Sequence, residues 1–200
     1  MTKIKICGLS READIEYANE LLPDYIGFVF AKKSTRYVQP EVAGSLKANL
    51  NSQIRAVGVF VNEPIEHIYK LVESGTIDIV QLHGSEDNSY IYELRQRAKS
   101  PVIKAFSISS QEDIHIAEQS QADYILLDSG KGGTGKVFDW SIISNLNRPF
   151  FLAGGLSSDN VSAAVADYNP FAVDISSGVE MGGHKDYGKM KEFIETVRSD

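Results

Sequence analysis

The single cysteine of this 200-residue chain, Cys7, stands where a general base could act. It ends a short apolar run and precedes Gly8. Lys5 lies two residues before it, so the alternation of a β-strand would direct both side chains to one face. A neighbouring ammonium group favours the thiolate, the form of cysteine that accepts a proton. A lone cysteine is often only a small buried apolar residue, but the position at a strand end favours the base.

Asp128 is the matching candidate for a general acid. It ends an apolar run that contains Leu126 and Leu127, where a carboxylate is costly unless it has partners or a function. A helix cap or a salt bridge is the structural alternative. Burial beside leucine favours the protonated carboxyl, which can donate a proton. Cys7 and Asp128 lie far apart along the chain, so only a closed fold can bring this base and acid together.

Further polar residues follow other apolar runs. His83 stands beside Gly84, where it either contacts a substrate or has a purely structural role. The four histidines lack the helical i, i+4 ligand spacing and no cysteine pair accompanies them, so we expect no metal site. The other candidates at strand ends are Lys5, Arg36, Asn62, Gln81, Ser107, Asp174, Ser176 and Ser177.

Two glycine-containing stretches, 152–157 and 174–178, indicate a phosphate site. Each follows an apolar run and precedes a predicted helix. Glycine lets an anion approach backbone N–H groups closely, and in closed α/β barrels a phosphate commonly lies between the last two such loops. Either stretch alone could simply end a strand. Together they predict binding residues at Gly154, Gly155, Ser176, Ser177 and Gly178.

A third glycine-rich stretch, 130–136, matches the first seven positions of a nucleotide-binding P-loop. The eighth position is Val137, where a Ser or Thr hydroxyl would be needed to hold magnesium. The stretch is therefore better interpreted as a loop that closes over a site.

These residues must be positioned by eight short apolar runs that predict β-strands, because successive runs start 22 to 30 residues apart and leave room for one helix after each. Continuous apolar runs are typical of parallel strands covered on both faces. An open sheet would be expected to carry a G-x-G-x-x-G turn after its first strand, which is missing after Cys7. We therefore predict a single-domain (β/α)8 TIM barrel over residues 1–200. The runs are 3–7, 25–30, 55–61, 77–82, 101–106, 123–128, 149–153 and 171–175.

Several helix starts can be predicted from local signals. Pro40 and Pro64 are placed at first helical positions. Ser85 is a candidate cap of the helix after the fourth strand, and Ser157 or Ser158 of the helix after the seventh. The segment 107–120 is more polar, and the bounds of its helix are less defined.

Composition excludes several classes of protein. The formal net charge is -7 and the basic residues are scattered, so we expect no nucleic-acid partner. No apolar run approaches the roughly 18 residues of a membrane span. One cysteine cannot form an intrachain disulfide, and no signal peptide is visible, so we expect a cytoplasmic protein without membrane association.

The chain resembles the phosphoribosylanthranilate isomerase family along essentially its whole length. Two departures are Thr35, where the family frequently has proline, and residues 181–184, which replace a more usual Pro-Gly segment. The motifs that carry the resemblance are Lys5-Ile6-Cys7-Gly8, Gly27-Phe28-Val29-Phe30 with Ser34 and Arg36, 57–62, 80–84, 126–129, 132–140, 152–156 and 174–180.

This resemblance implies an Amadori rearrangement of N-(5-phosphoribosyl)anthranilate in tryptophan biosynthesis, without metal or organic cofactor. Asp128 would protonate the furanose oxygen, and Cys7 would remove the proton from C2 of the sugar. Arg36 would pair with the anthranilate carboxylate, while the loops around Gly155 and Ser177 would hold the phosphate.

Two alternatives stay open at this point. One is a related phosphate-binding lyase or aldolase in which Lys5 forms a Schiff base with a carbonyl substrate. The other is a barrel that binds a phosphosugar without catalysing its conversion. The polar strand ends favour an enzyme over the second alternative.

Overall fold

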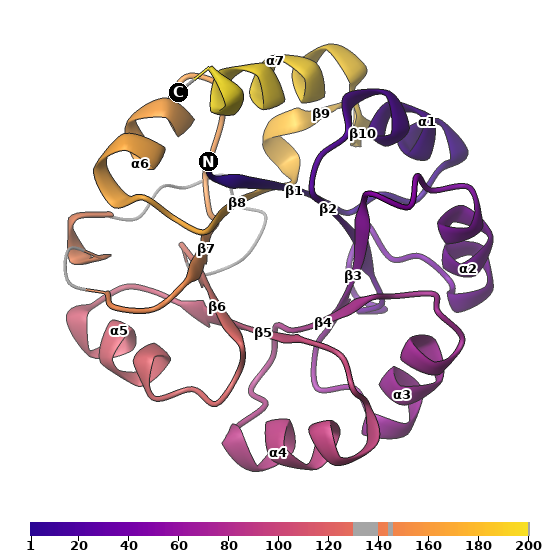
Figure 1. Cartoon of the computed structure of the whole chain (residues 1–200), viewed down its shortest axis with the longest axis vertical. Helices are drawn as coiled ribbons and strands as arrows, with labels where there is room; N and C mark the ends of the chain where they lie inside the picture. The colour runs from indigo at the N-terminus through magenta and orange to yellow at the C-terminus, as the bar shows by residue number, and fades with distance from the viewer. Residues whose placement is uncertain (130–139, 144–145, 200) are drawn as a thin grey trace.

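The chain folds into a closed barrel of parallel strands surrounded by helices (Figure 1). The computed structural model describes residues 1–129, 140–143 and 146–199. Within these residues each strand pairs with the next, and β8 returns to pair with β1, which confirms the predicted (β/α)8 barrel. The strands are β1 (Lys3–Cys7), β2 (Tyr25–Val29), β3 (Arg55–Phe60), β4 (Ile79–Leu82), β5 (Val102–Ser107), β6 (Tyr124–Asp128), β7 (Phe150–Leu152) and β8 (Ala172–Ile175).

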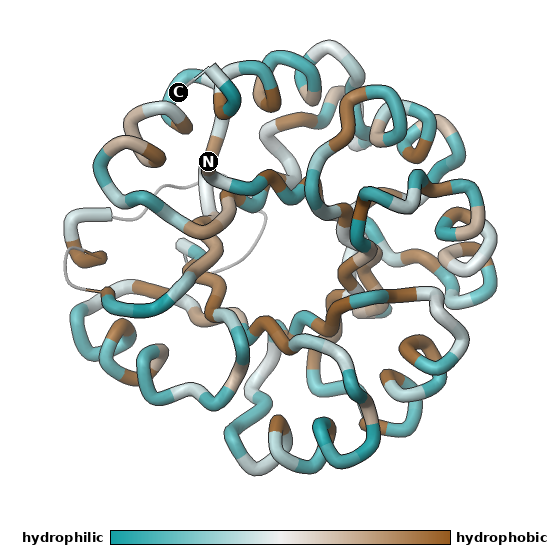
Figure 2. The backbone as a smooth tube through the Cα atoms, viewed as in Figure 1, coloured by the Kyte–Doolittle hydropathy of each residue, from teal (hydrophilic) through white to brown (hydrophobic). Residues whose placement is uncertain are grey.

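The strands are apolar on both faces because each face is covered. On β1, Ile4 and Ile6 pack in the layer between the strands and the helices, whereas Cys7 belongs to a small cluster with Val29 and Val59. A third cluster, from Tyr25 to Ala172, includes residues of the other strands. In Figure 2 the apolar residues of the helices lie mainly on the side that faces the strands, and the polar residues lie mainly on the outer side. Period-two alternation thus directs one set of side chains inward and the other beneath the helices.

Seven α-helices lie in the described residues, and several begin close to the predicted positions. Pro40 occupies the first turn of its helix as predicted, whereas Pro64 caps the next helix, which starts one residue later than predicted. The polar segment 107–120 contains a helix that starts with a capping box at Ser110. The helices are α1 (Glu12–Leu21), α2 (Pro40–Ala48), α3 (Ile65–Glu73), α4 (Asn88–Arg97), α5 (Gln111–Glu118), α6 (Val161–Tyr168) and α7 (Tyr187–Arg198).

Two predicted helix caps are wrong. Asp87 caps α4 in place of Ser85, whose backbone N–H and hydroxyl both donate to Asn62. Asn160 occupies the cap position of α6 in place of Ser157 or Ser158, and its side chain turns back toward the preceding loop. The side chains of Ser85 and Asn160 form hydrogen bonds that fix loops after strands. Local sequence signals do not reveal these longer-range contacts.

Two connections depart from the plain strand-and-helix repeat. Between β6 and β7 the described residues contain a single 3-10 turn, Trp140–Ile143. After β8 the chain forms a second short turn, Ser177–Val179, and then a two-stranded hairpin of β9 (Glu180–Met181) and β10 (His184–Lys185) before α7. The hairpin lies at the carboxyl end of β8, beside the polar strand ends (Figure 1).

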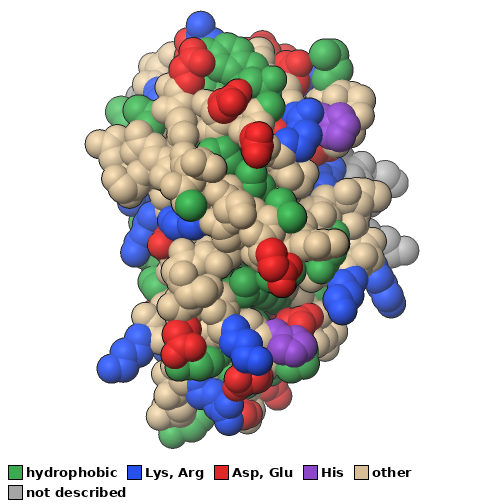
Figure 3. All heavy atoms as spheres, turned by 90° about the vertical axis from the view of Figure 1, so that its right-hand side faces the viewer, with side chains coloured by type: hydrophobic (Ala, Val, Ile, Leu, Met, Phe, Trp, Pro, Cys, Tyr) green, Lys and Arg blue, Asp and Glu red, His purple; other side chains and the backbone are tan. Residues whose placement is uncertain are grey.

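The surface carries charges of both signs. Figure 3 shows the side of α2 and α3, where basic and acidic side chains are interspersed. In the described part of the chain, no helix is long and apolar enough to cross a membrane. The domain bounds 1–200 stay a prediction, since residue 200 and two internal stretches are not described.

A buried ion pair fixes the loop that follows β4. Lys104 Nζ lies 2.9 Å from Glu86 Oε2 and also donates to the carbonyl of Gly84. Glu86 accepts from the backbone N–H groups of Asn62 and Gly84. Burial opposes the charge of Glu86, but Lys104 and these donors outweigh it and lower the pKa of the carboxyl. The network therefore ties together the ends of β3, β4 and β5 beside His83.

Replacing Lys104 should destabilise the fold strongly. Lys104→Met leaves Glu86 buried without its cation, and we expect a loss of about 3–5 kcal/mol in the free energy of unfolding. The measurement is urea denaturation followed by circular dichroism. Arg97→Met, which removes an exposed ion pair with Glu66, is the control and should cost less than about 1 kcal/mol. Equal losses in the two variants would contradict the role given to Lys104.

Candidate active site

A cavity of about 290 Å³ opens at the carboxyl ends of the barrel strands. Barrel closure gathers residues from β1, β2, β3, β4, β6 and β8, and from the loop after β7, around it. All the predicted site residues except Lys5 line this cavity: Cys7, Arg36, Gln81, His83, Asp128, Gly154, Gly155, Asp174, Ser176, Ser177 and Gly178. Of the other polar residues noted at strand ends, Asn62 and Ser107 do not line it.

Lys5 lies inside the barrel and is completely buried. Its Nζ is 2.8 Å from Asp174 Oδ1, because β1 and β8 pair with Lys5 opposite Asp174. Although burial opposes the charge of Lys5, Asp174 and then Cys7 raise the pKa of the ammonium group. The structure therefore places Lys5 beneath the cavity as a charged partner of Asp174 and not on the cavity wall.

Cys7 lies at the edge of the cavity, where burial raises the pKa of its thiol. Burial raises the pKa of Cys7 more than the ammonium groups of Lys5 and Lys185 lower it, and the carboxylate of Asp174 adds to the rise. Lys5 thus favours the thiolate as predicted, but burial opposes this effect and outweighs it. Sequence spacing places Lys5 correctly but shows neither the depth of burial nor the carboxylate that shares its charge.

Asp128 enters the cavity from β6 and faces His83. Its Oδ2 lies 3.5 Å from His83 Nε2, and its Oδ1 accepts from the backbone N–H of Ser129. Gln81 Nε2 lies 3.2 Å from His83 Nδ1, so Gln81, His83 and Asp128 form a chain of contacts along the cavity wall. Gln81 Oε1 is buried and has no hydrogen-bond partner among the described residues.

Two glycines leave the space that the candidate acid and base need. A Cβ atom on Gly27 would lie 2.7 Å from Cys7 Sγ, and one on Gly154 would lie 2.8 Å from Asp128 Oδ1. Both distances are shorter than real Cβ contacts, so any larger residue at Gly27 or Gly154 would displace the thiol or the carboxyl. The glycines of the quoted motifs therefore have a steric role beside the candidate catalytic groups.

The two predicted phosphate loops contact each other. A Cβ on Gly178 would lie 2.5 Å from the carbonyl oxygen of Leu156, so the loop after β8 packs directly on the loop after β7. Asn160 holds the latter by donating to the carbonyl of Gly155 and accepting from the N–H of Ser157. Ser176 Oγ donates to the carbonyl of Cys7, which joins the loop after β8 to the end of β1.

Arg36 reaches the cavity from the loop after β2. It is held there by Glu180 of the hairpin, with Nε and Nη2 donating to the two carboxylate oxygens. Lys185 donates to Glu180 and to the carbonyl of Ser176. Glu180, Lys185 and Asn160 were not predicted from the sequence as site residues. Glu180 belongs to the motif 174–180, but no neighbouring residue in the sequence indicates which side chains it contacts.

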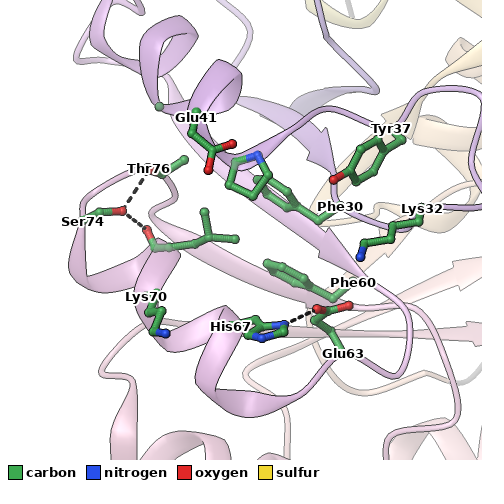
Figure 4. Close-up of a pocket in the computed structure, with 13 residues that line it drawn as sticks. Phe30, Lys32, Tyr37, Glu41, Phe60, Glu63, His67, Lys70, Ser74 and Thr76 are labelled. Carbon is green, nitrogen blue, oxygen red and sulfur yellow. Dashed lines mark hydrogen bonds and ion pairs between the residues drawn. The ribbon is translucent and has the colours of Figure 1, made fainter.

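A larger cavity of about 600 Å³ lies outside the barrel between α2 and α3. Figure 4 shows its aromatic floor, Phe30 and Phe60, with Tyr37, Glu41 and His67 around it. Phe30 and Phe60 stack with ring centroids 5.2 Å apart. This cavity contains none of the predicted site residues. Phe30 and Phe60 each follow a valine, Val29 or Val59, that lines the inner cavity. The alternation of side chains along the chain therefore directs the two rings to the outer face of the barrel.

The glycine-rich stretch 130–136, predicted to close over the site, lies outside the described residues. Within the described ranges, no group of three or more His, Cys, Asp or Glu could hold a metal ion.

Comparison with known proteins distinguishes among the possible functions of this cavity. A family model described as "N-(5'phosphoribosyl)anthranilate (PRA) isomerase" matches residues 4–196. The chain belongs to the phosphoribosylanthranilate isomerase family. The N-(5'-phosphoribosyl)anthranilate isomerase of Endomicrobium trichonymphae is 46% identical over 203 residues, which cover 100% of both chains. The reaction is therefore the isomerisation of N-(5-phosphoribosyl)anthranilate in tryptophan biosynthesis, and the Schiff-base alternative for Lys5 is set aside.

Solved structures give the same result. The phosphoribosylanthranilate isomerase of Thermotoga maritima is 39% identical, with a TM-score of 0.92 over 100% of both chains. A second isomerase structure, 37% identical with a TM-score of 0.90 over 100% of both chains, holds reduced 1-(o-carboxyphenylamino)-1-deoxyribulose 5-phosphate.

The single thiol of the isomerase allows a direct test of its environment. We expect the rate of alkylation of Cys7 by iodoacetamide to rise with pH about a midpoint above that of the same thiol in urea-unfolded protein. The reason is that burial raises the pKa of Cys7 in the folded state, so the reactive thiolate forms at higher pH. Cys7→Ser controls for labelling elsewhere. A folded-state midpoint at or below the unfolded one would show that Lys5 and Lys185 outweigh burial.

Proposed function

We propose that Cys7 is the general base and Asp128 the general acid of the Amadori rearrangement, and that the cavity binds the substrate at both ends. The single observation that carries this proposal is that Cys7 and Asp128 border one cavity from β1 and β6, each beside a glycine that makes room for it. The phosphate end lies at the loops around Gly155 and Ser177. The carboxylate end lies at Arg36. Binding at both ends holds the ribose between the two proton-transfer groups.

The first step opens the ring. Asp128 donates a proton to the furanose oxygen as the C1–O bond breaks, and the nitrogen lone pair forms a C1–N double bond. The resulting iminium makes the hydrogen on C2 acidic. Asp128 is left as a carboxylate, whose Oδ2 lies 3.5 Å from Nε2 of His83.

The second step moves the C2 proton. Cys7, as the thiolate, removes it, and the electrons of the C2–H bond form a C1–C2 double bond while those of the iminium return to nitrogen. The enolamine becomes the ketone when C1 takes up a proton and the C2 hydroxyl loses one. No electrons enter or leave, so the sequence needs only groups that give and take protons.

The proposal can be tested with substrate generated in place. Loss of anthranilate-type fluorescence of phosphoribosylanthranilate should depend on the protein and should proceed without added metal or organic cofactor. If no part of the loss depends on the protein, the proposed function is overturned. We also propose a cytoplasmic protein whose partner is this small phosphorylated substrate, without nucleic acid or membrane. The interspersed surface charge supports the expectation about nucleic acid.

Removing the acid or the base should slow turnover and leave the fold intact. Cys7→Ala and Asp128→Asn should each reduce kcat by roughly 10² to 10⁴, the usual span for one positioned proton-transfer group. Asp167→Asn, on the exposed side of α6, is the control and should keep parental activity. If folded Cys7→Ala turns over at a near-parental rate with chemistry rate-limiting, Cys7 is not the base.

The phosphate loops should respond to a single glycine change. Gly155 has a φ of 72°, so Gly155→Val strains the loop after β7 and should abolish competition by inorganic phosphate against substrate. Gly75→Val is the matched control, because Gly75 has a φ of 71° at the end of α3, far from these loops. Unchanged phosphate competition in folded Gly155→Val would move the phosphate site elsewhere.

A further inference from the structure

The hairpin after β8 sets two charges opposite each other. Gly182 and Gly183 have φ values of 59° and 81°, the left-handed conformation that a two-residue hairpin turn favours. The resulting register pairs Lys185 with Glu180, and side chains directly opposite on an antiparallel pair lie on the same face. Lys185 Nζ accordingly lies 2.5 Å from Glu180 Oε1. The turn therefore places this ion pair next to the cavity.

Glu180 occupies one edge of the Arg36 guanidinium. Nε donates to Oε1 at 2.6 Å and Nη2 donates to Oε2 at 2.8 Å. A guanidinium carries five N–H groups in a plane, so this pairing leaves Nη1 and the second hydrogen of Nη2 on the adjacent edge. That remaining edge is again a two-donor fork, which matches a carboxylate. Glu180 thus fixes which edge of Arg36 is available to a ligand.

The charges of the cluster decide whether it attracts an anion. Arg36 and Glu180 alone form a neutral pair, which gives a carboxylate little net attraction. Lys185 adds one positive charge and is only 4% exposed. Burial lowers the pKa of Lys185, while Glu180 opposes that effect. Burial also opposes the charge of Glu180, but Arg36 and Lys185 outweigh it and hold the pKa of Glu180 below its ordinary value. The three side chains together carry a net charge of about +1.

We propose that Glu180 and Lys185 are positioning residues that determine specificity for the substrate's carboxylate. Glu180 orients Arg36, and Lys185 cancels the charge of Glu180 so that the cluster keeps one net positive charge for an aromatic carboxylate. This inference rests on the proposed function, in which Arg36 binds the anthranilate carboxylate. Neither residue touches the reacting atoms, since both act through Arg36.

The test compares binding of two probes. One is reduced 1-(o-carboxyphenylamino)-1-deoxyribulose 5-phosphate, and the other is the same compound without the carboxylate. The wild-type protein should prefer the carboxylate form. In Lys185→Met that preference should fall about tenfold or more, because Arg36 and Glu180 then form a neutral pair that attracts the carboxylate less. The Kd of the carboxylate-free probe should stay within about twofold of the parental value.

A second variant separates charge from structure. Glu180→Gln/Lys185→Met again leaves one net positive charge on the cluster, so it should recover a large part of the carboxylate preference that Lys185→Met loses. Lys191→Met, which removes an equally charged but half-exposed side chain of α7, is the matched control and should bind both probes as the parent does. Circular dichroism establishes that each variant is folded.

The outcomes distinguish this inference from the proposed function. Equal weakening of both probes in Lys185→Met, an unchanged preference, or no recovery in the double variant would overturn the inference while the wild-type preference stands. No preference in the wild-type protein would instead refute the contact of Arg36 with the carboxylate, and this inference would fall with it. The Cys7 and Asp128 assignments would be unaffected, since turnover tests them separately.

Discussion

Closure of the barrel between β1 and β8 is the constraint on which the rest of the site depends. It brings Lys5 within 2.8 Å of Asp174, although 169 positions separate them along the chain. The same closure sets Cys7 beside the loop after β8, where Ser176 binds its carbonyl. On the outer side, α7 packs against α1 and seals the junction (Figure 1). Without this pairing, the base would have neither its charged surroundings nor a substrate-binding loop beside it.

Buried lysine–carboxylate ion pairs recur at the carboxyl end of the barrel. Each lysine that is buried among the described residues meets a carboxylate: Lys5 with Asp174, Lys104 with Glu86, and Lys185 with Glu180. A buried charge without a partner would be strongly unfavourable, so these pairs fix the loops that carry the site. Only the third pair also engages a further cation, Arg36. The charge available for an anionic substrate therefore comes from an arrangement that also stabilises the fold.

The strands and most site residues could be predicted because both leave periodic or local signals. Apolar runs mark strands, and polar residues at their ends mark the rim of a closed barrel, which is how Cys7 and Asp128 were found. The contacts of Glu180 and Lys185 could not be predicted, because they depend on a hairpin register and on a loop from another strand. The sequence could predict that Lys5 favours the thiolate of Cys7, but not the opposing effects of burial and of the Asp174 carboxylate, which exist only in the folded chain.

The most direct test of this account is a crystal structure of the protein with reduced 1-(o-carboxyphenylamino)-1-deoxyribulose 5-phosphate. We predict that the phosphate lies at the loops around Gly155 and Ser177 and the carboxylate at the free edge of Arg36. Sγ of Cys7 should then face C2, with the carboxyl of Asp128 near the oxygen on C4. An analogue bound with Cys7 and Asp128 both out of reach of these atoms would contradict it.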